Sequence, residues 1–140
     1  MMAAQARLDR GTVAVELTLF TPLLVLVLLL LVAAARLVSA REKVNDAAHQ
    51  AARSASIVTS PRTAAAVAVS TAHRAITAGG VACQRLEVST DTTGFHPGGS
   101  VTVQLTCTVT LSDLALLAVP GTRAISARFT APIDRWVGWP

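Results

Sequence analysis

Three residues near the start of the chain could take part in proteolytic processing and ion pairing. Glu16 lies five residues after Gly11, at the edge of an apolar run that contains the sequence LLVLVLLLLVAAA. A charged side chain at the centre of a bilayer costs about 2.5 to 3.5 kcal/mol, so intramembrane acids are usually paired and functional. Cleavage after Gly11 would give Thr12 an ammonium that can pair with Glu16 along one helix or between two staggered helices. The simpler interpretation is that Glu16 only marks the water-facing end of the apolar run.

Cys83 and Cys107 are the two cysteines of the chain, and both lie far from the apolar run. An even pair of cysteines in a small exported domain favours a disulfide. Closing a loop of about 25 residues would stabilise the domain by about 3 kcal/mol in the chain-entropy model. The alternative is a pair of buried free thiols in a cytoplasmic domain.

The remaining polar residues form no catalytic or metal-binding pattern. His49, His73 and His96 lack metal-ligand spacing to one another or to the cysteines. The sequence contains no nucleophile elbow, phosphate-binding loop or paired carboxylates. We therefore predict no catalytic residue, no metal and no cofactor, and we do not expect an enzyme.

The charges also argue against a nucleic-acid partner. The net charge of +4 arises from twelve lysines and arginines against eight acids, and the arginines are scattered along the chain. Only 4% of the residues are aromatic, so few side chains are available to stack on bases. No basic patch is visible that could bind a nucleic acid.

The apolar run defines the first structural element. The 140-residue chain is 52% hydrophobic and 14% charged, and its mean hydropathy is +0.55. As a helix, residues 17–35 would span roughly 28 Å, which is close to the hydrocarbon thickness of a bilayer. The sequence predicts one transmembrane helix near the N-terminus, with a kink at Pro22 because proline lacks a backbone donor.

The helical pattern continues beyond the transmembrane segment without a glycine or proline. In residues 41–58, small apolar residues recur at spacings of three and four, and polar residues occupy much of the rest. We expect one helix from about Thr12 to about Ser56. A second helix should follow, capped by Ser60 and ended by the glycine pair at 79–80.

Three strand patterns complete the expected fold. Residues 83–90, 100–111 and 123–136 alternate apolar and polar side chains, and a turn-rich loop joins the first two. The predicted fold class is α+β: a long N-terminal transmembrane helix that continues into an amphipathic helix, a second shorter helix, and a small antiparallel sheet of about three strands. One face of the sheet must be covered, and the alanine-lined face of the long helix is the expected cover.

This combination resembles the prepilin-peptidase site of type IV pilins and pseudopilins, and within them the TadE-like family of tight-adherence (Flp-type) pilus proteins. The resemblance rests on Gly11, the TVAVEL stretch with Glu16, the following Pro22 and the run VNDAAHQAARSAS. Leu17 departs from the relatives that carry an aromatic directly after the glutamate. The part of the chain beyond the helix is also longer than in major filament subunits, so a minor or accessory subunit fits better.

The resemblance implies a site and a set of partners. It implies cleavage between Gly11 and Thr12, and a need for Glu16 in processing or in the register of assembly. The implied partners are a prepilin peptidase, other pilins that pack against the helix, and the platform protein and ATPase motor of the pilus machine, together with the lipid bilayer.

The resemblance also implies an organisation and a location. Residues 1–11 would be a leader peptide, residues 12–58 the transmembrane and juxtamembrane helix, and residues 59–140 an extracytoplasmic, pilin-like α+β domain. The protein would lie in the cytoplasmic membrane of a bacterium with its N-terminus inside and its C-terminal domain outside, or be incorporated in a surface pilus.

Two other hypotheses for the apolar run stay open. A cleavable secretory signal would end at the VSA sequence of residues 38–40, although the run is longer than such signals usually are. An uncleaved signal anchor would leave a cell-surface protein with no pilus role. Charge does not decide the orientation, because two arginines precede the run whereas Arg36, Arg41 and Lys43 follow it.

The C-terminal sequence RWVGWP contains both tryptophans. We expect Trp136 to pack in the core of the domain. Trp139, next to the last residue of the sequence, is the candidate for a contact with a partner subunit.

Overall fold

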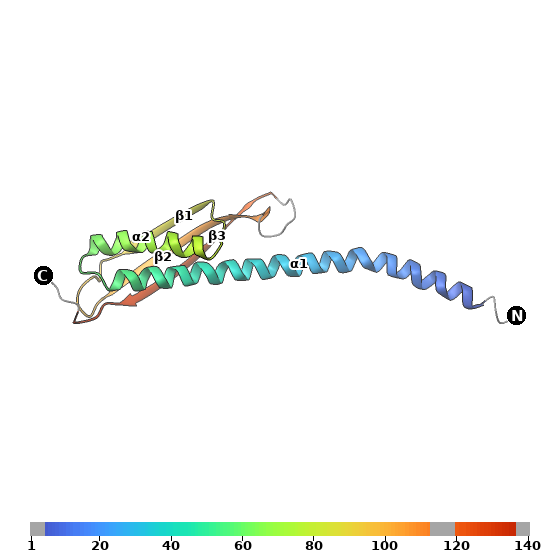
Figure 1. Ribbon diagram of the computed structural model, residues 1–140, viewed down its shortest axis with the longest axis horizontal. Helices are drawn as coiled ribbons and strands as arrows, with labels where there is room; N and C mark the ends of the chain where they lie inside the picture. Colours follow the sequence, from blue (N-terminus) through green and yellow to red (C-terminus); the bar gives the residue numbers. More distant parts are fainter. Residues whose placement is uncertain (1–4, 113–119, 137–140) are drawn as a thin grey trace.

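The computed structural model describes residues 5–112 and 120–136 of the chain. The elements follow in the order α1 (Gln5–Ser56), α2 (Pro61–Ala78), β1 (Arg85–Asp91), β2 (Ser100–Thr110) and β3 (Thr122–Pro132). Figure 1 shows α1 as a long rod whose C-terminal half lies along α2 and the sheet, whereas its N-terminal half extends beyond them alone. The α+β class expected from the sequence is confirmed.

Helix α1 is one uninterrupted helix of 52 residues. It ends at Ser56, as predicted, but it begins at Gln5 rather than at Thr12. The start expected near Thr12 is therefore wrong, because the helix also includes residues 5–11. Alanine, arginine, leucine and glutamine are good helix formers, so the helix extends through this segment. Pro22 lies inside α1, and Figure 1 shows the helix axis bending towards its N-terminal end.

Helix α2 begins and ends at the residues that the sequence predicts. Ser60 caps its first turn and Pro61 occupies its first helical position. At the other end, Gly80 adopts a φ of +67°, and the Val81 N–H donates a hydrogen bond to the Ile76 carbonyl at 3.3 Å. This bond belongs to a Schellman motif, which needs a left-handed residue and turns the chain towards the sheet.

The three strands form an antiparallel sheet in the order β1-β2-β3. Leu105 of β2 lies at the centre, opposite Val88 of β1 and Ala127 of β3. Every second residue of β2 faces the helices and is buried: Val101, Val103, Leu105, Cys107 and Val109. The alternation seen in the sequence therefore gives the correct inward face of β2.

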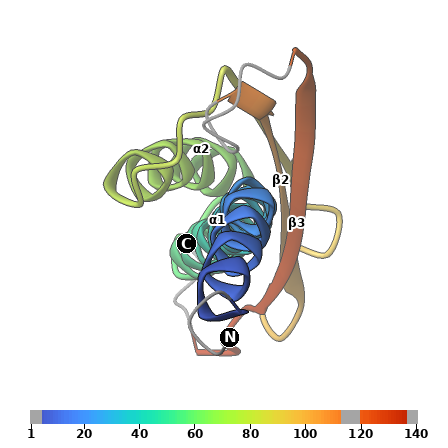
Figure 2. The same ribbon diagram turned by 90° about the vertical axis from the view of Figure 1, so that its right-hand side faces the viewer.

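Helices α1 and α2 cover one face of this sheet (Figure 2). The buried face of α1 consists of small side chains: Ala40, Val44, Ala47, Ala48, Ala51, Ala52 and Ala55. Because alanine carries nothing beyond Cβ, α1 can lie close to both α2 and the sheet. The alanine-lined cover expected from the sequence is confirmed.

The opposite face of the sheet is polar. Three residue pairs that lie opposite each other in β2 and β3 are hydrogen-bonded through their side chains: Thr102 with Thr130 at 2.8 Å, Thr106 with Ser126 at 3.1 Å, and Gln104 with Arg128 at 2.7 Å. An antiparallel sheet with one covered face and one polar face is the arrangement that alternating sequences specify.

Trp136 does not pack in the core, so that expectation is wrong. Its side chain is 90% exposed, and its backbone N–H donates a hydrogen bond to Asp134 Oδ1 at 3.1 Å. The covered side of the sheet ends at Ile133, which is buried, and the chain turns outward before it reaches the tryptophan. Trp139 lies outside the described residues.

Candidate functional site: the N-terminal half of the long helix

The N-terminal half of α1 exposes an apolar surface. Leu24 and Leu30 are 67% and 65% exposed, and most of the described apolar side chains between them are exposed as well. The most apolar stretch of this helix is almost entirely exposed. A core helix of a soluble domain would bury its leucines. Within the described residues, this is the one helix long and apolar enough to cross a membrane.

The change from exposed to buried surroundings occurs within one turn of α1. Arg36 is exposed, Leu37 is half-buried, and Ala40 is buried against the domain. Both surroundings are provided by one continuous helix, without a linker between them. The candidate membrane span and the α+β domain are therefore joined through a helix rather than through a flexible segment.

The residues of the expected processing site lie on the same helix. Gly11, Thr12 and Glu16 fall within α1, on the N-terminal side of the exposed leucines. Thr12 and Glu16 are four positions apart in the sequence, which corresponds to about one turn of the helix. Gly11 lowers the local helix stability by about 1 kcal/mol relative to alanine, because glycine has the largest backbone freedom to lose.

Cys83 and Cys107 form the disulfide that the sequence favours. Their Cα atoms are 5.4 Å apart, and 24 positions separate them along the chain. Cys107 lies on the covered face of β2, and Cys83 lies in the segment between α2 and β1. The bond therefore ties the end of the helical layer to the central strand of the sheet.

The histidines do not gather into a site. The ring of His49 packs edge-on against the ring of Phe129, with centroids 4.3 Å apart, and so joins α1 to β3. His73 lies on the exposed side of α2 and His96 in the loop before β2. In residues 5–112 and 120–136, no group of three or more histidines, cysteines and acids could hold a metal ion.

Asp91 is an exposed carboxylate at the end of β1, and its surroundings lower its pKa. The backbone N–H of Thr93 donates to Asp91 Oδ1 at 2.9 Å, and the hydroxyl of Thr93 donates to the same oxygen at 2.7 Å. The positive charge of Arg128 lowers the pKa further. These bonds shape the turn after β1, as an aspartate does when it closes on the backbone two residues on. The hydrogen bonds from Thr93 are local, whereas the influence of Arg128 could not be predicted from the sequence because this residue comes from a distant strand.

Fold and site together define a protein with one long apolar helix that continues into a small α+β domain. Residues 11–53 match the family model described as TadE-like protein. The matched segment begins at Gly11 and ends in the buried half of α1, which confirms the resemblance noted in the sequence. The TadE-like family is a structural, non-enzymatic kind of protein associated with tight-adherence pilus assembly. No curated protein and no solved structure matches the chain.

Proposed function

We propose that this protein is a minor, pilin-like subunit of a tight-adherence pilus or a related secretion apparatus. A prepilin peptidase would cleave the precursor between Gly11 and Thr12. The observation that carries this proposal is that the TadE-like match starts at Gly11 and covers an exposed apolar helix that runs directly into the domain. A helix of this kind can pack among other helices while it holds its domain at a fixed position.

Glu16 has a defined task in this proposal. Cleavage creates an ammonium on Thr12 at the edge of the membrane, four residues from the carboxylate of Glu16. The ammonium and carboxylate can pair within one helix, or between two helices that are staggered by about one turn. Leucine surfaces alone specify little in a lipid environment, so a polar contact of this kind would set the register of neighbouring subunits.

The location that we propose is the cytoplasmic membrane of a bacterium, with a single span, the N-terminus inside and the domain outside. The disulfide between Cys83 and Cys107 supports an outside domain, because disulfides persist in oxidising compartments and are rare in the cytosol. Other pilins would contact the apolar half of α1. The platform protein and ATPase motor of the pilus machine are the further partners of this proposal.

The N-terminal residue of the mature protein tests the proposal directly. Intact mass measurement on protein from native membranes should give a chain that starts at Thr12. A Gly11→Leu variant should retain the preceding residues, because the peptidase would no longer find its glycine. A chain that starts at Arg41 would instead identify a secreted protein, and a chain that still carries Met1 would identify an uncleaved anchor. Either of these results contradicts pilin-type processing.

Glu16→Gln tests the pairing step separately. The variant should remain in the membrane, since its apolar run is unchanged, but its recovery in sheared pili should fall about tenfold. Polar contacts between membrane helices contribute about 1 to 2 kcal/mol, and about 1.4 kcal/mol corresponds to a factor of ten. Glu42→Gln is the matched control, because Glu42 is an exposed acid on the same helix beyond the apolar run. Normal pilus incorporation of Glu16→Gln would count against the mechanism.

A further inference from the structure

The sheet has an open edge at β3, which is the last strand in the order β1-β2-β3. The Leu111 N–H donates to the Gly121 carbonyl at 3.0 Å, and the Ile133 N–H donates to the Gly99 carbonyl at 2.9 Å. Both pairs continue the register of β2 on β3. Bonded residues alternate in an antiparallel ladder, so the odd-numbered residues of β3 bond to β2. The even-numbered residues direct their backbone groups away from β2.

Four even-numbered residues in the middle of β3 present these backbone groups along the edge: Ala124, Ser126, Arg128 and Thr130. All four are exposed, and their backbone groups have no hydrogen-bond partner in the part of the chain that the structure describes. Pro132 lacks an N–H and lies at the end of the strand, where edge strands tolerate proline. Successive unpaired donors and acceptors on a strand can pair with an added strand.

A groove of about 530 Å³ lies beside this edge. Six consecutive residues of β3, residues 123–128, line it from the sheet, and Arg41, Glu42 and Asn45 line it from α1. Six residues of an extended strand span about 20 Å, which is the length of a typical strand. The groove therefore accompanies the open edge over a distance that suits an extended segment.

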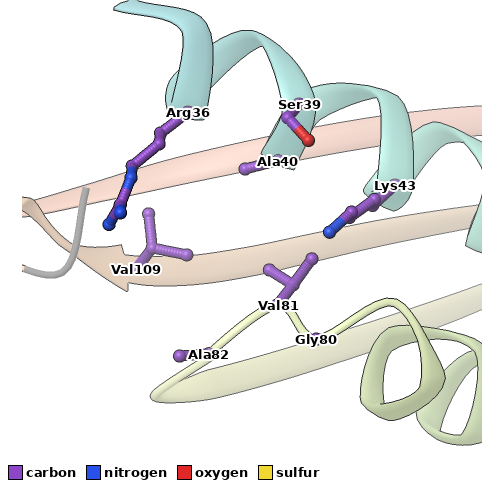
Figure 3. A pocket seen from close by; sticks show the side chains of 8 residues that line it. All are labelled: Arg36, Ser39, Ala40, Lys43, Gly80, Val81, Ala82 and Val109. Carbon is purple, nitrogen blue, oxygen red and sulfur yellow. The ribbon is translucent and has the colours of Figure 1, made fainter. Parts of the chain in front are cut away.

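This groove is separate from the pocket on the other side of α1. Figure 3 shows Arg36, Ser39 and Lys43 of α1 around that pocket, together with the segment after α2 and the end of β2. With 3.6 residues per turn, positions 41, 42 and 45 lie on the opposite side of the helix from positions 36, 39 and 43. The groove at β3 therefore has its own lining.

Positive charge exceeds negative charge in the groove. Arg41, Arg123 and Arg128 line it, and Glu42 is the one acid among its described lining residues. Arg41 and Arg123 form no ion pair or hydrogen bond with a described residue, and Arg128 donates to the Gln104 side chain. An added strand directs alternate side chains to the two faces of the sheet. Its carboxylates would lie near Arg41 and Arg123 on one face and near Arg128 on the other.

We propose that the open edge of β3 binds an extended, acidic segment of another protein as an additional strand of the sheet. Backbone hydrogen bonds to the even-numbered residues of β3 would hold the segment, and the three arginines would select its carboxylates. The site goes beyond the proposed function, because it gives the domain a partner of its own. It depends neither on cleavage after Gly11 nor on a helix that crosses a membrane, so either proposal can fail without the other.

The test is peptide binding to the purified full-length chain in a nonionic detergent, measured by fluorescence anisotropy at low ionic strength. The probe is a labelled octapeptide of alternating threonine and glutamate, because threonine favours strands and glutamate supplies carboxylates. One control peptide has glutamine in place of glutamate. The other keeps the sequence and charge but carries a methyl group on each backbone nitrogen, so it cannot donate hydrogen bonds to β3. Wild type should bind the probe about tenfold more tightly than either control.

Two variants test the two parts of the site. Ala124→Pro removes an N–H from the open edge without removing a bond to β2, and it should weaken binding about tenfold. Arg41→Gln with Arg123→Gln leaves the edge intact and should weaken binding about fivefold, which keeps the test decisive if the proline variant does not fold. Arg53→Gln with Arg62→Gln is the matched control, because it removes the same charge from exposed positions outside the groove. It should bind like wild type.

Four results would overturn the proposal. Wild type that does not bind the probe would leave the arginines as charges that protect an open edge from pairing. Equal binding of the methylated peptide, or an equal loss in both arginine double variants, would show that charge alone is responsible. Self-association of wild type in sedimentation velocity that Ala124→Pro abolishes would identify a second copy of this chain as the occupant instead of an acidic partner.

Discussion

Two neighbouring residues at the end of β1 show how exposure determines the cost of a polar side chain in this domain. Asp91 is exposed and has two hydrogen bonds from Thr93, so its charged form is stabilised where water is also available. Thr90, one residue earlier, points towards the helices, and its Oγ1 is buried without a hydrogen-bond partner among the described residues. Neighbouring residues of one strand thus face opposite sides, and the cost of a polar atom differs between the two sides.

Titration of Asp91 should give a midpoint below the ordinary pKa of 3.8. Since the folded state lowers this pKa, the carboxylate stabilises the fold fully above about pH 3.8, and this contribution is lost as the pH falls through the lower folded pKa. Thr93→Val removes the hydroxyl donor but keeps the backbone donor, so the midpoint should rise only part of the way. Carboxyl-carbon NMR of the full chain measures it, with Thr92→Val as control. A midpoint unchanged in Thr93→Val would contradict this account.

Thr90→Val should stabilise the domain by about 1 kcal/mol, because it replaces a buried hydroxyl without a partner by a methyl group of similar shape. Denaturant unfolding followed by circular dichroism would show the change as a higher midpoint with an unchanged slope. Thr106→Val is the control, because the Thr106 hydroxyl is hydrogen-bonded to Ser126 on the polar face. A destabilised Thr90→Val would show that this hydroxyl has a partner after all.

Among the elements, α1 has two halves with different surroundings: the N-terminal half is exposed, and the C-terminal half packs against the domain. Its N-terminal half carries large apolar side chains all round, which suits lipid, and its C-terminal half carries alanines on the side that faces the sheet. The alanines contribute little buried area each, so the stability of this interface depends on how closely the helix approaches its neighbours.

Ala51→Leu should therefore destabilise the domain by about 1 to 3 kcal/mol, because Ala51 is fully buried and extra methylenes would push α1 off its neighbours. The matched control is Ala66→Leu, the same exchange at an exposed position of α2. Denaturant unfolding of both variants gives the comparison. If Ala51→Leu were as stable as Ala66→Leu, the close packing of α1 on the sheet would be refuted.

Much of the element level could be predicted from the sequence because the patterns are local. The alternation in β2, the alanine spacing of α1 and the cap at Ser60 each involve residues within a few positions of one another. The register of β3 on β2 is different, because Thr102 meets Thr130 across 28 positions and no local pattern specifies that pairing. The exposure of Trp136 could not be predicted for a related reason: the alternation does not show where the covered face ends.

The candidate site also combines features that the local sequence predicts with features that depend on distant residues. Gly11, Thr12, Glu16 and the apolar run are close in sequence, so the amino-acid order alone is enough to group them. The contact of the His49 ring with Phe129 could not be predicted, because it joins a helix and a strand that are distant in sequence.

At the scale of the whole molecule, the long helix and the disulfide together keep the sheet attached to the helices. The α+β domain has a thin core, in which many of the buried side chains are alanines. A small core of this kind gains much from a covalent link between distant segments. The Cys83–Cys107 bond connects the segment after α2 to the central strand, and β2 in turn packs against α1. Loosening this bond should therefore weaken the attachment of the sheet to α1.

Cys83→Ala should lower the stability of the domain by about 3 kcal/mol under oxidising conditions, because the unfolded chain regains the freedom of the closed loop. Hydrogen exchange of the β2 amides in the full chain reports this, since the central strand opens only when the domain does. Reduced wild type should exchange as fast as the variant, and a reductant should not change the variant further. The buried Cys107 thiol can remain in place as a small apolar side chain. Equal exchange in oxidised and reduced wild type would mean that the bond contributes nothing to holding the sheet.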